Sequence, residues 1–267
     1  MTNESLGGVV ASPDAPLPPS LKRIREHNST FGVLGRLAMP LLLGMAKYEV
    51  RGKEKLPARG GFVIAPNHYS NFDPISVGVV LFNLGRVPRF LAKASLWKVP
   101  VLGWIMRSTG QIPVDRSGRT RGSDPVQSGG AAIARGEGVI VYPEGTLTRE
   151  PDLWPMRGKS GAVRLALESG APLIPMAHWG VQDIMSRYSK GISVFPRKHI
   201  VAVIGDPVDL SAYRGRRLEN HEYIEATELL MASITRLLAS VRDGTPPVER
   251  YDPAKHNQSE YGRFDDK

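Results

Sequence analysis

Short apolar runs alternate with helical patterns from Glu49 onward, and this alternation constrains the fold of the 267-residue chain more than any other feature. It favours an α/β fold, in which helices flank a mostly parallel central sheet within one domain. We expect this domain to span residues 49–244. The pattern predicts strands over residues 62–65, 89–92, 110–114, 139–142, 173–177, 192–195 and 200–204, and helices over residues 74–84, 102–107, 125–134, 161–168 and 222–241. In the last helix, five apolar residues form a stripe that we expect to pack on the sheet: Ile224, Leu229, Ile234, Leu237 and Val241.

Three further segments lie outside this domain. Residues 1–19 are rich in Gly, Pro and Ser, which predicts a disordered N-terminus. Residues 20–48 are basic and apolar, and they predict a helical segment that associates with a membrane. Residues 245–267 are polar and nearly balanced in charge, so we expect a flexible tail.

Two interpretations of the segment 20–48 stay open. Between Pro19 and Gly60, nine basic residues accompany three acidic ones. The apolar run over residues 31–46 is interrupted by Arg36 and Pro40 and is shorter than the ~20 residues of a membrane span. It lies in the membrane interface with its basic flanks on anionic headgroups, or it packs on the domain as an apolar helix. The basic flanks favour the first, hence a peripheral or monotopic position on the cytoplasmic face of the cell membrane.

The composition excludes several classes of chemistry. The sequence contains no cysteine, which excludes disulfides, thiolate metal sites and cysteine nucleophiles. The histidines show no metal-ligand spacing, and we expect neither a metal nor a cofactor. The net charge of +9 is not accompanied by a nucleic-acid-binding motif, so we expect no nucleic-acid partner and favour an anionic membrane surface.

One histidine and one carboxylate, His68 and Asp73, lie five positions apart after the predicted strand 62–65. A neutral imidazole can take a proton from a hydroxyl near pH 7, and a nearby carboxylate can fix its tautomer. Because this spacing is poor on a regular helix, we expect Asp73 to be the N-cap of a helix that begins at Pro74. The sequence has no serine elbow, so the pair predicts a base that acts on a substrate hydroxyl.

Three later segments add to this pair. The segment 110–116 contains a predicted strand followed by Arg116. The segment 141–146 contains the end of another strand, followed by Glu144, Gly145 and Thr146. The segment 171–177 is a predicted strand bracketed by prolines. In this order and spacing, the four segments resemble the four sequence blocks of the glycerolipid acyltransferase family, the 1-acylglycerol-3-phosphate acyltransferases of the PlsC type. The resemblance covers roughly residues 49–207.

The resemblance implies a reaction and a role for each block. A fatty acyl chain would pass from acyl-CoA or acyl carrier protein to a hydroxyl of lysophosphatidic acid, forming phosphatidic acid in phospholipid biosynthesis. His68 corresponds to the general base that deprotonates this hydroxyl, and Asp73 to the carboxylate that orients it. Arg116 corresponds to the arginine that binds the acceptor's phosphate. The acceptor-binding turn corresponds to Glu144, Gly145 and Thr146, and the donor side of the pocket to Pro175.

The chain departs from the family pattern at Leu147, where the third block commonly has an arginine. Arg149 or Arg157 would supply that charge from a shifted position, or Arg116 would act together with Lys93, which follows a predicted strand. Lys159 precedes a predicted helix whose N-terminus favours anions, and it is a further candidate for phosphate binding.

Two other residues pose questions that the sequence leaves open. A carboxylate at Glu144 would repel a phosphate, so we expect it to bind glycerol hydroxyls, backbone amides or a basic side chain. His178 follows a predicted strand with no evident acid partner, and we expect a structural role or a place at the rim of the site.

Two alternative functions remain. The first keeps the chemistry and changes the acceptor to glycerol 3-phosphate, another lysophospholipid or a glycolipid; Leu147 weakens the argument for a phosphate acceptor. The second is a lipid-binding protein without turnover, against which the intact pair of His68 and Asp73 speaks.

Overall fold

A central five-stranded sheet organises the computed structural model, which describes residues 29–114 and 125–258. Its strand order is β1-β7-β6-β2-β5. Three neighbouring pairs are parallel, and β6 pairs with β7 in the antiparallel sense. The strands are β1 (Ala46–Arg51), β2 (Phe62–Pro66), β5 (Gly138–Ile140), β6 (Leu173–Trp179) and β7 (Lys198–Ile204). A second, two-stranded parallel sheet consists of β3 (Leu91–Lys93) and β4 (Ile112–Val114).

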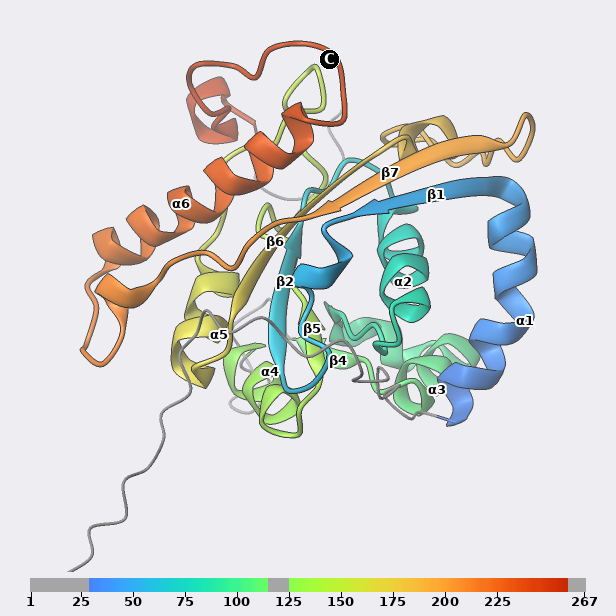
Figure 1. The fold of residues 1–267 in the computed structure, drawn as a ribbon, viewed down its shortest axis with the longest axis horizontal. Helices are drawn as coiled ribbons and strands as arrows, with labels where there is room; N and C mark the ends of the chain where they lie inside the picture. Colours follow the sequence, from blue (N-terminus) through green and yellow to red (C-terminus); the bar gives the residue numbers. More distant parts are fainter. Residues whose placement is uncertain (1–28, 115–124, 259–267) are drawn as a thin grey trace, which may run out of the picture.

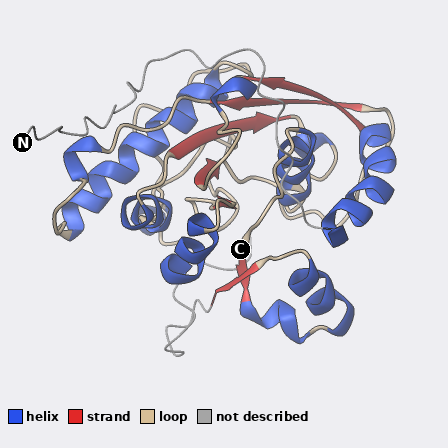
Figure 2. Ribbon diagram, turned by 60° about the horizontal axis from the view of Figure 1, so that its bottom comes forward, coloured by secondary structure: helices blue, strands red, loops and turns tan. Residues whose placement is uncertain are grey.

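Helices cover both faces of the large sheet, as Figure 1 shows. Helices α4 (Pro125–Ala134), α5 (Gly161–Ser169) and α6 (Asn220–Ala239) lie on one side, and α2 (Asp73–Asn83), α1 (Ser29–Met45) and α3 (Pro100–Ser108) lie on the other. Figure 2 shows the same helices around the strands from a second direction. The expected α/β fold with a mostly parallel sheet is therefore confirmed.

Strand β2 explains why the sheet is covered on both faces. Val63 and Ala65 point into a core shared with α4, α5 and α6, whereas Phe62 and Ile64 point into a core shared with α2. All four side chains are fully buried. A strand buried on both faces is a continuous apolar run rather than an alternating one, and this is the pattern of residues 62–65.

The structure corrects two predictions about elements and adds one strand. Residues 192–195 form an exposed loop instead of a strand, and β1 is a strand that the pattern did not predict. In α6, Ile224 and Leu229 are exposed, so they do not pack on the sheet. The helix instead buries a row four residues apart, which is Ala226, Leu230, Ile234 and Leu238.

Helix α1 packs on the domain with one side only. Its Phe31 ring lies 5.6 Å from the ring of Phe82 at the end of α2, and Met45 is buried at its last turn. Val33 and Leu37 remain exposed on the other side, as does Leu41. Within residues 29–114 and 125–258, none of the helices has the length and apolar character required to cross a bilayer. Residues 1–28, which comprise the expected disordered N-terminus and the first part of the segment 20–48, lie outside the described part.

The described part of the expected tail contacts the domain. The backbone N–H of Arg157 donates to the carbonyl of Tyr251 at 2.8 Å, and Arg250 Nε lies 2.9 Å from Glu228 Oε2 on α6. Residues 259–267 lie outside the described part of the chain.

Candidate active site

Three neighbouring strands bring the candidate residues to one edge of the sheet. His68 and Asp73 follow the carboxyl end of β2, Glu144 follows β5, and His178 lies near the end of β6. Because β6, β2 and β5 are adjacent and parallel, their carboxyl ends meet at the same edge. This is where open α/β sheets bind ligands.

His68 and Asp73 form the hydrogen-bonded pair at the centre of the site. His68 Nδ1 lies 2.9 Å from Asp73 Oδ2. The same oxygen accepts the backbone N–H groups of Tyr69 at 2.7 Å and Ser70 at 2.8 Å, and Asp73 is fully buried. Three donors on one carboxylate oxygen fix the loop that carries His68 relative to the start of α2.

The helix start differs from the expectation by one residue. Asp73 is the first residue of α2 and Phe72 is its N-cap, so the prediction that Asp73 is the N-cap and Pro74 the first helical residue is wrong. The carboxylate still lies in the first turn, where it interacts favourably with the helix dipole. This position directs Asp73 Oδ2 back toward the preceding loop.

The pairing with Asp73 sets the chemistry of His68. Because the carboxylate accepts from Nδ1, the neutral ring carries its proton there and Nε2 is the basic nitrogen. The side chain is 16% exposed, so it retains access to a substrate. Its ring stacks on Tyr142 with centroids 4.1 Å apart, and Tyr142 stacks in turn on Phe90. Sequence reasoning missed Tyr142, although it stands in the block that contains Glu144.

Glu144 binds backbone amides, one of the three partners considered for it. Its Oε1 accepts the backbone N–H of His68 at 2.9 Å, and its Oε2 accepts that of Met156 at 3.1 Å. Burial raises the pKa of this carboxyl to about 8, and these two hydrogen bonds oppose the rise. Glu144 is therefore mostly neutral at pH 7, which removes the repulsion expected between a carboxylate and a nearby phosphate.

A second histidine lies behind the pair. His178 Nε2 is 3.9 Å from Asp73 Oδ1 and 3.1 Å from the carbonyl of Asn67, while its Nδ1 is 3.1 Å from the hydroxyl of Tyr69. Because the carbonyl of Asn67 can only accept, Nε2 carries the ring proton, and Nδ1 accepts a hydrogen bond from the Tyr69 hydroxyl. Burial lowers the pKa of His178. Its burial agrees with the expected structural role and places it in the core rather than at the rim. Asp73 is an acid near His178 that the sequence did not indicate, although 3.9 Å is beyond hydrogen-bond distance.

Asn67 connects the ends of β2 and β6. Its side-chain amide donates to the carbonyl of His178 at 3.2 Å and accepts the backbone N–H of His178 at 2.9 Å. Pro175 lies in β6 opposite Ala65 of β2. This register places the fourth sequence block next to the strand that leads to His68.

The turn at Gly145 needs a glycine. Its φ of +72° is in the left-handed region, which L side chains adopt at a cost. A Cβ at this position would lie 3.3 Å from Lys159 Cδ, and the backbone N–H of Lys159 donates to the carbonyl of Pro143 at 2.7 Å. Thr146 is half-buried beside Gly145. The structure thus brings Lys159 to the turn that contains Glu144, Gly145 and Thr146.

The other candidate cations are distributed differently. Arg116 lies outside the described residues, and Lys93 is the last residue of β3. Leu147 and Arg149 are both 6% exposed, and the backbone N–H of Arg149 contacts Met156 Sδ at 3.4 Å. Arg157 is exposed and lies 3.5 Å from Asp252 in the C-terminal segment. Two arginines are the candidate replacements for the missing arginine at Leu147. Of these, Arg157 points toward the C-terminal segment, and Arg149 is buried.

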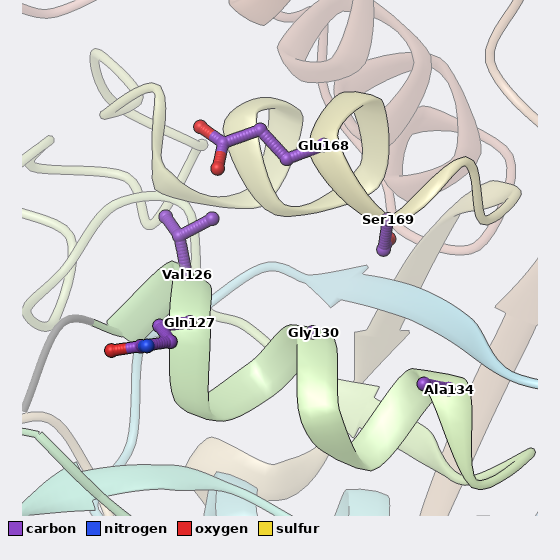
Figure 3. Close-up of a pocket in the computed structure, with 6 residues that line it drawn as sticks. All are labelled: Val126, Gln127, Gly130, Ala134, Glu168 and Ser169. Carbon is purple, nitrogen blue, oxygen red and sulfur yellow. The ribbon is translucent and has the colours of Figure 1, made fainter.

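A surface hollow lies apart from the site, and none of the candidate residues that the structure describes lines it. It has a volume of about 400 Å³ and lies between α4 and α5 (Figure 3). Its lining is Val126, Gln127, Gly130, Ala134, Glu168 and Ser169. We therefore assign the candidate chemistry to the strand ends and not to this hollow.

Comparison with known proteins identifies relatives of this chain. A family profile described as "Acyltransferase" matches residues 47–179. The chain is 33% identical over 163 residues to a 1-acyl-sn-glycerol-3-phosphate acyltransferase of Bacillus subtilis, covering 60% of this chain and 73% of that protein. It is 30% identical over 198 residues to the protein of the same name from Escherichia coli, covering 70% and 72%.

Other relatives match a smaller part or show the fold alone. A chloroplastic 1-acyl-sn-glycerol-3-phosphate acyltransferase of Brassica napus is 31% identical over 147 residues, which are 55% of this chain and 41% of that protein. The chain thus spans less than half the length of this plant relative. The crystal structure of the 1-acyl-sn-glycerophosphate acyltransferase PlsC from Thermotoga maritima aligns with a TM-score of 0.55 and 20% identity, covering 77% of each chain.

Proposed function

We propose, since this chain belongs to the acyltransferase family, that it transfers a fatty acyl chain from an acyl thioester to a hydroxyl of lysophosphatidic acid, forming phosphatidic acid. One observation carries the proposal: the hydrogen bond of 2.9 Å between His68 Nδ1 and Asp73 Oδ2 at the carboxyl end of β2. The names of the relatives support the choice of acceptor.

In the proposed mechanism, His68 Nε2 takes the proton of the acceptor hydroxyl while its oxygen attacks the thioester carbonyl. The carbon–oxygen bond forms, the carbon–sulfur bond breaks, and CoA or acyl carrier protein leaves as a thiol that takes up the proton from His68. Asp73 stabilises the imidazolium between these steps. No group on the protein is acylated, which fits a chain without cysteine.

Lys159 and Arg116 are the proposed partners of the acceptor's phosphate, with Lys93 and Arg149 as further candidates. The position of Lys159 against Gly145 supports its part in this set. The neutral form of Glu144 at pH 7 supports a phosphate nearby, because it adds no negative charge to the turn. Glu144 acts here through the backbone that it holds, and Thr146 contacts the acceptor.

We also propose that the protein works at the surface of an anionic membrane. The exposed stripe of α1, which consists of Val33, Leu37 and Leu41, supports this placement, and so do the nine basic residues between Pro19 and Gly60. A peripheral position on the cytoplasmic face lets the lysolipid present its headgroup to the site while its chain stays in the bilayer.

The test is a product analysis with one labelled acyl-CoA and a panel of acceptors. The panel contains lysophosphatidic acid, glycerol 3-phosphate, lysophosphatidylcholine and a glycolipid. We expect labelled phosphatidic acid as the main product. Labelled product from another acceptor alone would reject lysophosphatidic acid and keep the chemistry, whereas no thiol release with any acceptor would reject the enzyme.

A further inference from the structure

The loop before β7 is apolar, basic and exposed. All residues from 191 to 197 are exposed, and Phe195 has 86% of its surface accessible, with Ile192 and Val194 at 53% each. In the described part of the chain these strand-forming side chains pair with no strand, and three large apolar side chains within four residues stay in water. Monomeric proteins rarely expose such a patch unless it binds something.

Charge complementarity points to the partner. Residues 186–199 contain no acidic residue, and Lys190, Arg197 and Lys198 lie before and after the apolar residues. Arg187 is not part of this set, because it donates to the carbonyls of Thr148 and Glu150. Basic side chains around an apolar tip match the anionic headgroups and the acyl region of a lipid surface, respectively. The same combination of exposed apolar and basic residues occurs in α1 and its flanks, so we commit to a lipid surface rather than to an acidic protein partner.

The loop is attached to the C-terminal end of α1. Arg197 donates from its guanidinium to the carbonyl of Leu43 at 2.7 Å. Figure 1 shows this loop beside the junction of α1 and β1. The C-terminal end of the loop is therefore held against the C-terminal end of α1, the helix that carries the exposed stripe.

The base of the loop is joined to the loop that carries His68. The hydroxyl of Ser70 donates to the carbonyl of Met185 at 2.6 Å, and the backbone N–H of Ser193 donates to the carbonyl of Ile184 at 2.7 Å. Ile184 also shares one buried cluster with Met45 of α1 and with Tyr69. The loop is thus joined to the segment that carries His68. If the tip contacts a bilayer, this connection fixes the position of His68 relative to the lipid.

From these observations we infer that residues 190–197 form a second membrane-contacting element, which inserts Ile192, Val194 and Phe195 into an anionic lipid bilayer beside α1. The inference rests on one part of the proposed function, namely that the acceptor is a lipid that stays in the bilayer. It assigns to this loop the task of setting the height of His68 above the lipid, so that a lysolipid reaches it from the bilayer.

The first experiment uses the absence of cysteine from the sequence. Ile192→Cys provides a single thiol for an environment-sensitive fluorophore, and Val248→Cys, at a fully exposed position in the C-terminal segment, is the matched control. With vesicles of phosphatidylcholine and phosphatidylglycerol, we expect the label at position 192 to brighten severalfold and shift to the blue, and the control label to stay unchanged. An unchanged signal at position 192 would overturn the inference.

The second experiment measures vesicle affinity by cosedimentation. We expect Phe195→Ser to weaken binding about tenfold, while Val248→Ser binds like the parent. Lys190→Glu is expected to weaken binding about tenfold on anionic vesicles and to leave weak binding to pure phosphatidylcholine unchanged. Affinities of Phe195→Ser within twofold of the parent would contradict the inference, as would a dimer in solution that this substitution dissociates.

Turnover separates this inference from the proposed function. We expect Phe195→Ser to raise KM for a long-chain lysolipid in vesicles and to leave kcat/KM for a water-soluble short-chain acceptor unchanged. A protein that inserts the loop but releases no thiol would reject the proposed function alone. A protein that turns over but whose loop stays out of the lipid would reject this inference alone.

Discussion

Glu144 gives the most informative prediction about stability. Its pKa rises from 4.5 to about 8 because of burial, so between these values the folded protein holds a proton that the unfolded chain has released. The free energy of unfolding therefore decreases as the pH rises through this window. A difference of about 3.5 pKa units corresponds to about 5 kcal/mol, which is a large part of the stability of a typical domain.

Glu144→Gln removes this dependence while keeping the shape of the side chain. Glutamine offers one oxygen where the carboxyl offers two, so the N–H of His68 or that of Met156 loses its acceptor. We expect the variant to be about 1–3 kcal/mol less stable than the parent at pH 5. At pH 8.5, where the parent holds a buried charge, the order reverses.

The assay is urea unfolding followed by far-ultraviolet circular dichroism from pH 5 to pH 8.5. Glu168→Gln, at an exposed position on α5, controls for the loss of a carboxyl group as such. If the stability difference between the parent and Glu144→Gln changed by less than about 1 kcal/mol over this range, Glu144 would not be a buried neutral acid, and the account of the turn would be wrong.

Three other substitutions test separate parts of the structure. Asp73→Asn should lower kcat at least about 100-fold in a thiol-release assay, because an amide stabilises an imidazolium poorly; an unchanged kcat would reject its role. Gly145→Ala should cost about 1 kcal/mol, since its φ of +72° is unfavourable for alanine, and a melting temperature equal to the parent's would contradict this. Arg86→Met should cost about 3–5 kcal/mol in urea unfolding, because the buried guanidinium donates to the carbonyls of Pro57, Gly60 and Gly136. A cost under about 1 kcal/mol would refute that.

The fold could be predicted where burial leaves a local pattern in the sequence. Strand β2 is fully buried on both faces, and its continuous apolar run marked it to within one residue. Strand β1 is polar and charged along much of its length and directly follows the apolar run of α1. The sequence therefore has neither a turn signal before this strand nor an alternating apolar pattern within it. Ile192, Val194 and Phe195 prefer strands locally, but none of the strands in the described residues pairs with them, and the local sequence does not show this.

The candidate site could be predicted in its centre and not in its surroundings. His68 and Asp73 are close in sequence, and their hydrogen bond needs only one loop. Tyr142 and His178 contact the same pair because β5 and β6 flank β2, and strand order is a property of the whole sheet. The protonation of Glu144 likewise depends on burial by distant residues, which the block around it does not encode.

The central claim is that His68 is the base of acyl transfer. The most direct measurement is the rate of thiol release from palmitoyl-CoA with lysophosphatidic acid, for the parent, for His68→Ala and for the exposed control His221→Ala. We predict that the first variant loses at least about 100-fold in kcat with its fold retained, and that the control keeps the rate of the parent. Full activity of His68→Ala would contradict the mechanism even if phosphatidic acid were the product.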